Sequence, residues 1–272
     1  MTDYATKSER FLALHLGDSP LLLPNPWDVG SAKLLAYLGF SALATTSSGY
    51  AATLGRLDGA VTKIEALDHA RQIVEATPLP VSADLENGFG DDPEAVADTM
   101  SEAIAAGLAG ASVEDYSGRA ESPIYDAGLA RERVAAAVES AHGGPVKLVV
   151  TARAENYLHG NPDLADTIAR LQSFQAAGAD VLYAPGISDL DDMHSLVSSV
   201  DLPVNALALP GLGSVGHLAA VGVRRISVGG SIAFAALGAV VEASRELIDE
   251  GTFGFLAHAG EGSAAARAAF TS

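Results

Sequence analysis

Short apolar runs alternate with longer amphipathic stretches along the whole chain. The apolar runs have the length of buried strands and begin near Leu21, Ser41, Leu79, Gly110, Lys147, Asp180, Leu202 and Arg224. The stretches between them carry apolar residues at i, i+3 and i+4, the spacing of a helix with one buried face. These stretches cover residues 30–38, 62–76, 93–107, 128–142, 163–177, 189–199 and 213–221. The pattern therefore predicts a succession of β–α units.

Strands that alternate with helices form parallel sheets. Eight such units without a linker predict one (β/α)8 barrel of the TIM type over residues 1–272, because this fold needs about 250 residues. An open doubly wound sheet is the alternative, but no G-x-G-x-x-G motif follows the first strand. Residues 4–16 predict an extra N-terminal helix. Residues 232–270 predict an Ala-rich helical extension, which we expect to pack on a second subunit of a homo-oligomer.

Charge and composition narrow the classes of partner. The formal net charge of −18 disfavours nucleic acid and anionic membrane surfaces. It also repels an anionic substrate, so a pocket for a carboxylate must carry its own positive charge. The chain has no cysteine, no apolar signal core at its start and no apolar run of ~20 residues. We therefore expect a cytoplasmic protein without thiolate chemistry.

Acidic side chains follow two neighbouring strands, where barrel proteins place their catalytic residues. Asp84 and Glu86 are two residues apart on an extended segment, so they are expected to point the same way. Glu114 ends the next strand, at an equivalent level. Three converging carboxylates need a cation, and oxygen ligands favour Mg2+ or Mn2+. The alternative is that these acids cap helices or pair with arginine.

Arg153 follows the apolar run KLVVTA and needs an anionic partner at the end of a buried strand. It is predicted to bind a substrate carboxylate or a developing enolate oxygen, or to form a salt bridge with Glu114 or Glu155. The loop at residues 45–50, TTSSGY, offers hydroxyl groups and backbone N–H groups for a carboxylate. The histidines are predicted to be surface residues, and none suggests zinc: His15, His69, His142, His159, His194, His217 and His258.

Five stretches, in this order between about residues 24 and 230, together resemble the isocitrate lyase/phosphoenolpyruvate mutase superfamily. They read PNPWDVGSAKLLAYLGFSALATTSSGYAATLGRLD, PVSADLENGFGD, GASVEDY, LVVTARAENYL and AGAD. The resemblance implies a β/α barrel, often with a C-terminal helix exchanged between the subunits of a dimer or tetramer. It also implies Asp84 as the direct Mg2+ ligand, with Glu86, Glu114 and Asp58 holding metal-bound water.

The resemblance further implies a site for a small carboxylate substrate. Arg153, Glu114 and Asp58 are predicted to be catalytic. The residues predicted to bind the substrate are Trp27, Thr46, Ser47, Ser48, Gly49, Arg153 and Asn205.

The loop after the fourth strand departs from the superfamily. It reads YSGRAESPIYDAG and lacks the cysteine and histidine of isocitrate and methylisocitrate lyases. Tyr116 stands where the mutase and phosphonopyruvate hydrolase have lysine, and Tyr116, Ser117 or Arg119 is a candidate replacement. The first hypothesis is a Mg2+-dependent lyase that forms an enolpyruvate-like intermediate from a 2-oxo or 2-hydroxy acid. The alternatives are P–C bond chemistry and a carboxylate-binding protein without catalysis.

Overall fold

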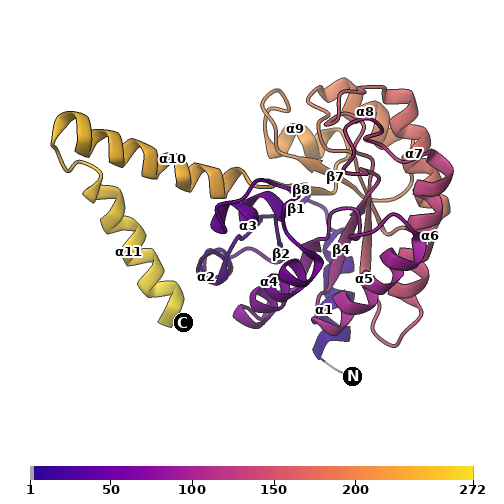
Figure 1. Ribbon diagram of the computed structural model, residues 1–272, viewed down its shortest axis with the longest axis horizontal. Helices are drawn as coiled ribbons and strands as arrows, with labels where there is room; N and C mark the ends of the chain where they lie inside the picture. Colours follow the sequence, from indigo (N-terminus) through magenta and orange to yellow (C-terminus); the bar gives the residue numbers. More distant parts are fainter. Residues whose placement is uncertain (1–2, 272) are drawn as a thin grey trace.

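Eight short parallel strands form the centre of the computed structural model, which describes residues 3–271 (Figure 1). They are β1 (Leu21–Leu23), β2 (Leu43–Ala44), β3 (Val81–Asp84), β4 (Gly110–Glu114), β5 (Val149–Arg153), β6 (Val181–Tyr183), β7 (Val204–Leu207) and β8 (Arg225–Ser227). Each strand from β2 to β8 pairs with its neighbour in sequence, and β8 pairs back with β1. The Ala44 N–H donates to the Pro24 carbonyl at 3.1 Å and links β2 to β1. The predicted barrel is confirmed, and the doubly wound alternative is excluded.

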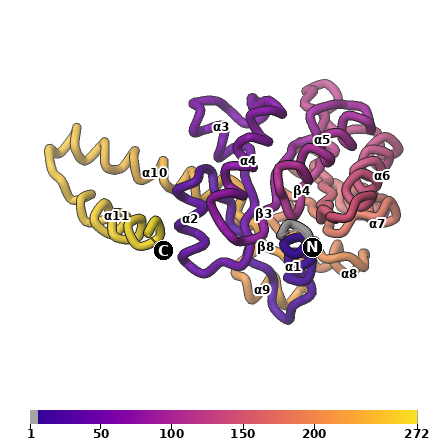
Figure 2. The backbone as a smooth tube through the Cα atoms, turned by 90° about the horizontal axis from the view of Figure 1, so that it is seen from below, coloured from indigo at the N-terminus to yellow at the C-terminus, as the bar shows by residue number. Residues whose placement is uncertain are grey.

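Helices follow the strands and cover the outside of the barrel (Figure 2). They are α2 (Val29–Tyr37), α4 (Lys63–Ala76), α5 (Pro93–Ala105), α6 (Ala127–His142), α7 (Leu164–Ala176), α8 (Leu190–Ser198) and α9 (Val215–Ala220). Each coincides with a predicted stretch to within about two residues. Residues 45–50 were wrongly predicted as a loop: α3 (Ser47–Thr53) begins there, because the Thr46 hydroxyl accepts the Gly49 N–H and caps the helix.

The lower end of the barrel is closed by α1 (Asp3–Leu14), the predicted N-terminal helix. Phe11 of α1 is fully buried in an apolar cluster with Leu21, Val149 and Val181, which stand at the beginnings of their strands. A Cβ on Gly110 would lie 2.7 Å from the Phe11 ring, so only glycine leaves room for this plug. Apolar side chains therefore fill the barrel at the amino ends of the strands, and polar side chains have space at the carboxyl ends.

The loop after β3 is held in an unusual conformation. Glu86 and Phe89 have φ angles of 48° and 59°, in the left-handed region that non-glycine residues rarely adopt. Arg133 of α6 is 1% exposed and donates to the carbonyls of Asn87, Gly90 and Asp91 in this loop. These charge-assisted bonds offset the backbone strain and fix the position of Glu86.

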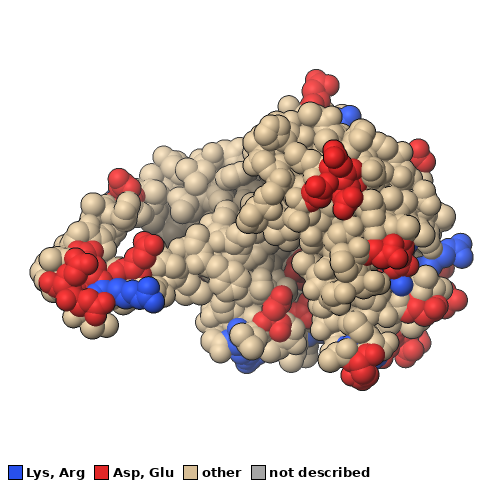
Figure 3. Space-filling model, turned by 90° about the horizontal axis from the view of Figure 1, so that it is seen from above, with Lys and Arg blue, Asp and Glu red and all other residues tan. Residues whose placement is uncertain are grey.

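The predicted C-terminal helical extension is an arm of two helices. α10 (Ser231–Arg245) leaves the barrel, a π-helical turn (Glu246–Glu250) follows, and Gly251 breaks the direction with φ 68°. α11 (Leu256–Thr271) then returns beside α2 (Figure 1). Figure 3 shows acidic side chains gathered at the far end of this arm.

The arm buries little of its own apolar surface. Ala233 is the buried residue of α10, whereas Phe234, Leu237, Val240 and Val241 are exposed. Across the part of the chain that the structure describes, no helix is both long and apolar enough to span a membrane.

Candidate active site

A cavity of about 180 Å³ opens at the carboxyl ends of the strands and reaches into the barrel. Most of its walls carry hydroxyl groups or short polar side chains, contributed by nearly every strand of the barrel. Its polar lining includes Asn25, Thr45, Thr46, Ser47, Ser48, Asp58, Ser82, Asp84, Ser112, Arg153, Tyr183, Asn205, Arg225 and Ser227. A space of this size and polarity suits a small organic acid.

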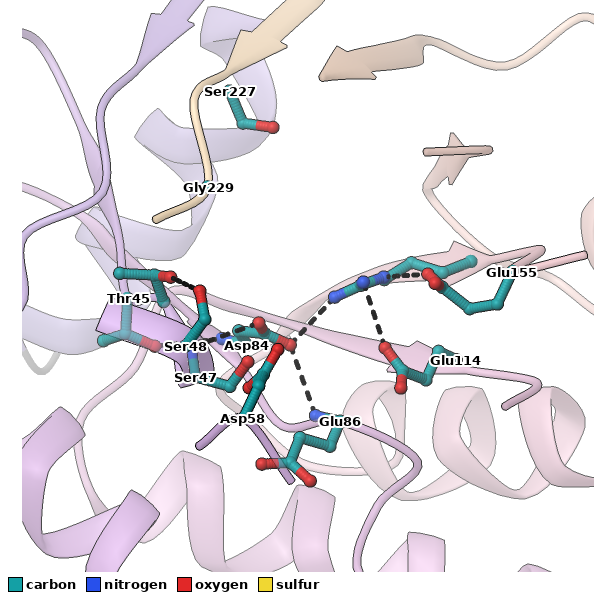
Figure 4. Close-up of polar contacts among 12 residues, drawn as sticks. Thr45, Ser47, Ser48, Asp58, Asp84, Glu86, Glu114, Glu155, Ser227 and Gly229 are labelled. Carbon is teal, nitrogen blue, oxygen red and sulfur yellow. Dashed lines mark hydrogen bonds and ion pairs between the residues drawn. The ribbon is translucent and has the colours of Figure 1, made fainter. Parts of the chain in front are cut away.

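Arg153 at the end of β5 joins three carboxylates (Figure 4). Its Nη1 lies 2.9 Å from Asp84 Oδ1, its Nη2 lies 3.0 Å from Glu114 Oε2, and its Nε lies 2.7 Å from Glu155 Oε1. The guanidinium plane also lies over the Tyr183 ring, with its Cζ 5.1 Å from the ring centroid. Both predicted salt bridges of Arg153, to Glu114 and to Glu155, are present, and the guanidinium also lines the cavity, where a ligand can reach it.

One cation among three buried acids leaves the site short of positive charge. Burial raises the pKa of Glu114 well above its ordinary value, with further increases from Glu155, Asp84 and Glu86, although Arg153 opposes the shift. Burial also raises the pKa of Glu155, again against Arg153. An additional cation beside these carboxylates would therefore be stabilised.

The prediction that Asp84 and Glu86 extend from one strand in the same direction is wrong. β3 ends at Asp84, and the chain turns there because Gly88 N–H bonds to the Leu85 carbonyl at 2.8 Å. Asp84 pairs with Ser112, whereas the Glu114 N–H donates to the Glu86 carbonyl at 3.0 Å. The Glu86 side chain consequently turns away from Asp84 (Figure 4). The left-handed backbone of Glu86 could not be foreseen from its spacing.

A second space of about 410 Å³ adjoins the cavity on the solvent side, and we call it the outer chamber. It shares Ser47, Asp58, Arg153 and Leu158 with the cavity. Its other charged or aromatic lining residues are Glu86, Glu114, Tyr116, Glu155 and His159. Burial raises the pKa of Glu86 to about 7, and the charges of Asp84 and Asp58 add to this effect. Glu86 thus belongs to the outer chamber.

The loop after β4 folds into a small hairpin beside the outer chamber. Tyr116 forms an antiparallel bridge with Ile124, and the Ser117 hydroxyl donates to the Ser122 carbonyl at 2.5 Å. Arg119 pairs with Asp91 at 2.7 Å on the surface and does not line either space. Of the three candidate replacements on this loop, Tyr116 alone lines the outer chamber.

Two histidines were wrongly predicted to lie on the surface. His15 and His69 are 1% and 5% exposed. A ring nitrogen of His15 bonds the Phe11 carbonyl, and a ring nitrogen of His69 bonds the Trp27 carbonyl. These bonds hold both rings inside the fold. His159 is half-buried at the outer chamber, where its ring stacks on Tyr116 with centroids 3.6 Å apart. This stack brings together the loops after β4 and β5, which sequence spacing does not reveal.

The residues predicted to bind substrate divide into two groups. Five of them line the cavity: Thr46, Ser47, Ser48, Arg153 and Asn205. The Ser47 N–H points at Asp84 Oδ2 from 3.3 Å.

The other two lie behind the cavity wall. A Cβ on Gly49 would lie 2.5 Å from Thr46 Cγ2 and 3.3 Å from Trp27, so Gly49 allows α3 to pack closely. Trp27 itself supports the start of α2 through its N–H bond to Ser31 Oγ. For these two residues the structure shows a packing role.

Sequence reasoning missed several polar residues of the inner cavity, chiefly Tyr183 and Arg225. Both lie on strands and face the barrel interior, where they are 8% and 4% exposed. The signal for Arg225 was present, because a charged residue inside a short apolar strand needs an explanation in the same way as Arg153 does.

The donor chemistry of the site fits a hard divalent cation. The available ligands are carboxylate oxygens. Burial, together with the charges of neighbouring acids, raises the pKa values of Glu86 and Glu114. Among the described residues, however, no three histidine or acidic side chains lie where they could hold a metal ion together. The arrangement therefore suits an ion that is held directly by fewer than three side chains and otherwise through water.

The fold and the site define a β/α-barrel protein whose polar centre lies where barrel enzymes carry out their chemistry. The chain belongs to the isocitrate lyase/phosphoenolpyruvate mutase superfamily, since the family model for phosphoenolpyruvate phosphomutase matches residues 11–248. The match confirms the resemblance read from the sequence.

Individual relatives extend over most of the chain. An uncharacterized protein of Mycobacterium tuberculosis is 35% identical over 88% of this chain and 89% of its own. Oxaloacetate decarboxylase of Chromohalobacter salexigens is 29% identical over 88% of this chain and 84% of its own.

Solved structures agree with this placement. A Burkholderia cenocepacia J2315 protein, provisionally described as a lyase/mutase, is 51% identical with a TM-score of 0.92 and covers 94% of this chain and 92% of its own. Phosphonopyruvate hydrolase, solved with oxalate and Mg2+, covers 90% of this chain and 88% of its own. At 22% identity and a TM-score of 0.81, it shows the shared fold.

The raised pKa of Glu86 predicts a pH-dependent stability. Because the folded protein holds this proton up to about pH 7 and the unfolded chain releases it near 4.5, the carboxyl stabilises the fold at low pH. This contribution is lost as the pH rises through 7. Between pH 5 and 8, the metal-free protein should lose about 1–3 kcal/mol of unfolding free energy relative to Glu86→Gln.

Urea denaturation of both proteins at the two pH values measures this difference. Glu132→Gln, on the exposed face of α6, is the matched control. Mg2+ should stabilise the wild-type protein more at pH 8, where no proton has to be displaced. A wild-type-to-variant difference that is the same at both pH values would refute the account of Glu86.

Proposed function

We propose that this protein is a Mg2+-dependent lyase that cleaves or decarboxylates a small 2-oxo or 2-hydroxy carboxylate. The observation that carries the proposal is Arg153, held by Asp84, Glu114 and Glu155 at the wall of a small hydroxyl-lined cavity. The oxaloacetate decarboxylase among the relatives supports C–C bond cleavage. Oxalate and Mg2+ in the phosphonopyruvate hydrolase structure support the carboxylate ligand and the metal.

The chain's own residues can bind the substrate and stabilise the charge that develops on it. A 2-oxo acid would replace Asp84 as a partner of Arg153 Nη1, so that the guanidinium faces the oxygen on which an enolate charge develops. Glu114 and Glu155 hold the remaining guanidinium nitrogens and fix its plane. Mg2+, when bound beside Asp84, supplies Lewis-acid polarisation of the same oxygen.

His159 is the side chain we propose for proton transfer at the outer chamber. Burial and the charge of Arg153 lower its pKa, so its imidazole is neutral at pH 7 and able to accept a proton. Stacking on Tyr116 fixes the ring, and its Nε2 lies 3.9 Å from Glu155 Oε2.

Release of pyruvate from a panel of 2-oxo and 2-hydroxy diacids tests the function. We expect turnover of at least one acid with Mg2+ and none with EDTA. Asp84→Asn, which removes one carboxylate from Arg153 and from the metal, should lower kcat/KM by 10²-fold or more.

Two results would speak for other functions. Turnover of phosphonopyruvate alone would favour P–C bond chemistry. Tight oxalate binding without turnover of any acid would favour a carboxylate-binding protein.

His159→Gln should lower kcat by about 10²-fold and leave KM within a factor of about three, because the ring carries a proton without binding the carboxylate. Steady-state kinetics at pH 7 measure this split. His194→Gln, on the exposed face of α8, is the matched control and should behave as wild type. An unchanged kcat in His159→Gln would remove this residue from the mechanism.

We also propose that the arm pairs two or more copies of the chain, because exposed Phe234, Leu237, Val240 and Val241 form an apolar face on α10. Replacing Leu237 and Val240 together with Asp should convert the oligomer to a monomer. Light scattering after gel filtration gives the mass. A monomeric wild-type protein at micromolar concentration would contradict this assembly.

A further inference from the structure

Arg225 of β8 is buried deep in the barrel without an acidic partner. It is 4% exposed, and its Nε donates to Asn205 Oδ1 at 2.9 Å. Its Nη1 lies 3.1 Å from Thr151 Oγ1 and 3.4 Å from His15 Nε2. Within the described residues, no carboxylate forms a salt bridge with Arg225. All of its hydrogen-bond partners are therefore groups without negative charge.

His15 does not supply the missing charge. Burial, followed by the charge of Arg225, lowers the pKa of His15 to about 3, so its ring is neutral at pH 7. Its Nδ1 donates to the Phe11 carbonyl at 2.8 Å, which leaves Nε2 as the acceptor facing Arg225. Burial lowers the pKa of Arg225 to about 10, with a smaller contribution from Arg153, so the guanidinium remains charged at neutral pH.

A lone buried charge is strongly destabilising unless something compensates it. A buried guanidinium with a purely structural role is expected to have an acidic partner, as Arg170 has in Asp115 at 3.1 Å, or several backbone carbonyls, as Arg133 has. Arg225 instead lines the cavity, and no hydrogen bond is formed by its Nη2 to any described residue. The free end of the fork is available to a ligand in the cavity.

The two arginines of the cavity are linked through the sheet. Arg153 is in register with Tyr183, Tyr183 with Asn205, and Asn205 with Arg225. Arg153 forms salt bridges with three carboxylates, whereas Arg225 forms none with the described residues. Arg225 also contacts His15, which follows the helix that closes the barrel. Arg225 therefore lies at the closed end of the cavity, away from the outer chamber.

We infer that Arg225 forms an anion subsite at the closed end of the cavity, which binds a second carboxylate of the substrate. The substrate is then a dicarboxylate, with one end near Arg153 and Asp84 and the other in the fork of Arg225. This inference rests on the proposed function, because it assigns the acid on which that function acts. The hydroxyl groups of Ser82, Ser112 and Ser227 line the path between the two ends.

Binding of two unreactive acids of equal chain length tests the inference. Calorimetry with succinate and with butyrate, in the presence of Mg2+, compares a dicarboxylate with a monocarboxylate. Wild-type protein should bind succinate at least 10-fold more tightly, because a charge-assisted pair at Arg225 is formed by succinate alone. Equal affinities in the wild-type protein would overturn the inference without any variant.

Arg225→Gln should weaken succinate binding by about 10- to 100-fold and leave butyrate binding within about threefold. Arg225→Lys, which keeps the charge but not the fork, should give an intermediate loss. The matched control is Arg224→Gln, because Arg224 is the exposed neighbour and donates to the Gly17 carbonyl outside the cavity. This control should bind both acids as the wild-type protein does.

The unliganded variant also reports on the role of Arg225. Removal of an uncompensated charge should leave the unfolding temperature of Arg225→Gln at or above that of the wild type. A strong fall in this temperature, or an equal loss of both acids, would show a structural arginine and overturn the inference. Because succinate and butyrate are not turned over, absence of lyase activity would count against the proposed function and not against this subsite.

Discussion

The salt bridges between Arg153 and Asp84, Glu114 and Glu155 are the interaction on which the site depends. A guanidinium offers five donors in one plane, and here that plane is fixed by acids from three different strand ends. The arrangement leaves more negative than positive charge in a buried place. It therefore favours both a further cation and an anionic ligand that can replace a carboxylate at Arg153.

The barrel places this local arrangement in a cavity whose outer and closed ends carry different charges. At the outer side, the strained loop after β3 carries Glu86, and Arg133 holds the loop through its backbone carbonyls. At the closed side, Arg225 carries a positive charge with neutral partners. A small dianion would enter past the acids, and its two ends would meet two arginines of different character.

Much of the fold could be predicted because it depends on local patterns. Apolar runs predicted all eight strands, and helical spacing predicted the helices between them. The positions of Asp84 and Arg153 at the carboxyl ends of predicted strands indicated that they belong to the site. The remainder depends on contacts between distant segments. The left-handed backbone of Glu86 needs Arg133 from α6, the burial of His15 needs Arg225 from the last strand, and the stack of His159 on Tyr116 needs two separate loops. The bend at Gly251 likewise could not be predicted from the apolar pattern of the C-terminal extension.

We expect Arg153 and its carboxylates to form a site for a metal ion and a small acid. A crystal structure with Mn2+ and oxalate, with the ion located by its anomalous signal, tests this most directly. We predict Mn2+ at Asp84, with oxalate between the ion and Arg153, in place of the bond from Arg153 Nη1 to Asp84 Oδ1. Mn2+ bound away from Asp84, or oxalate that leaves the contacts of Arg153 unchanged, would contradict it.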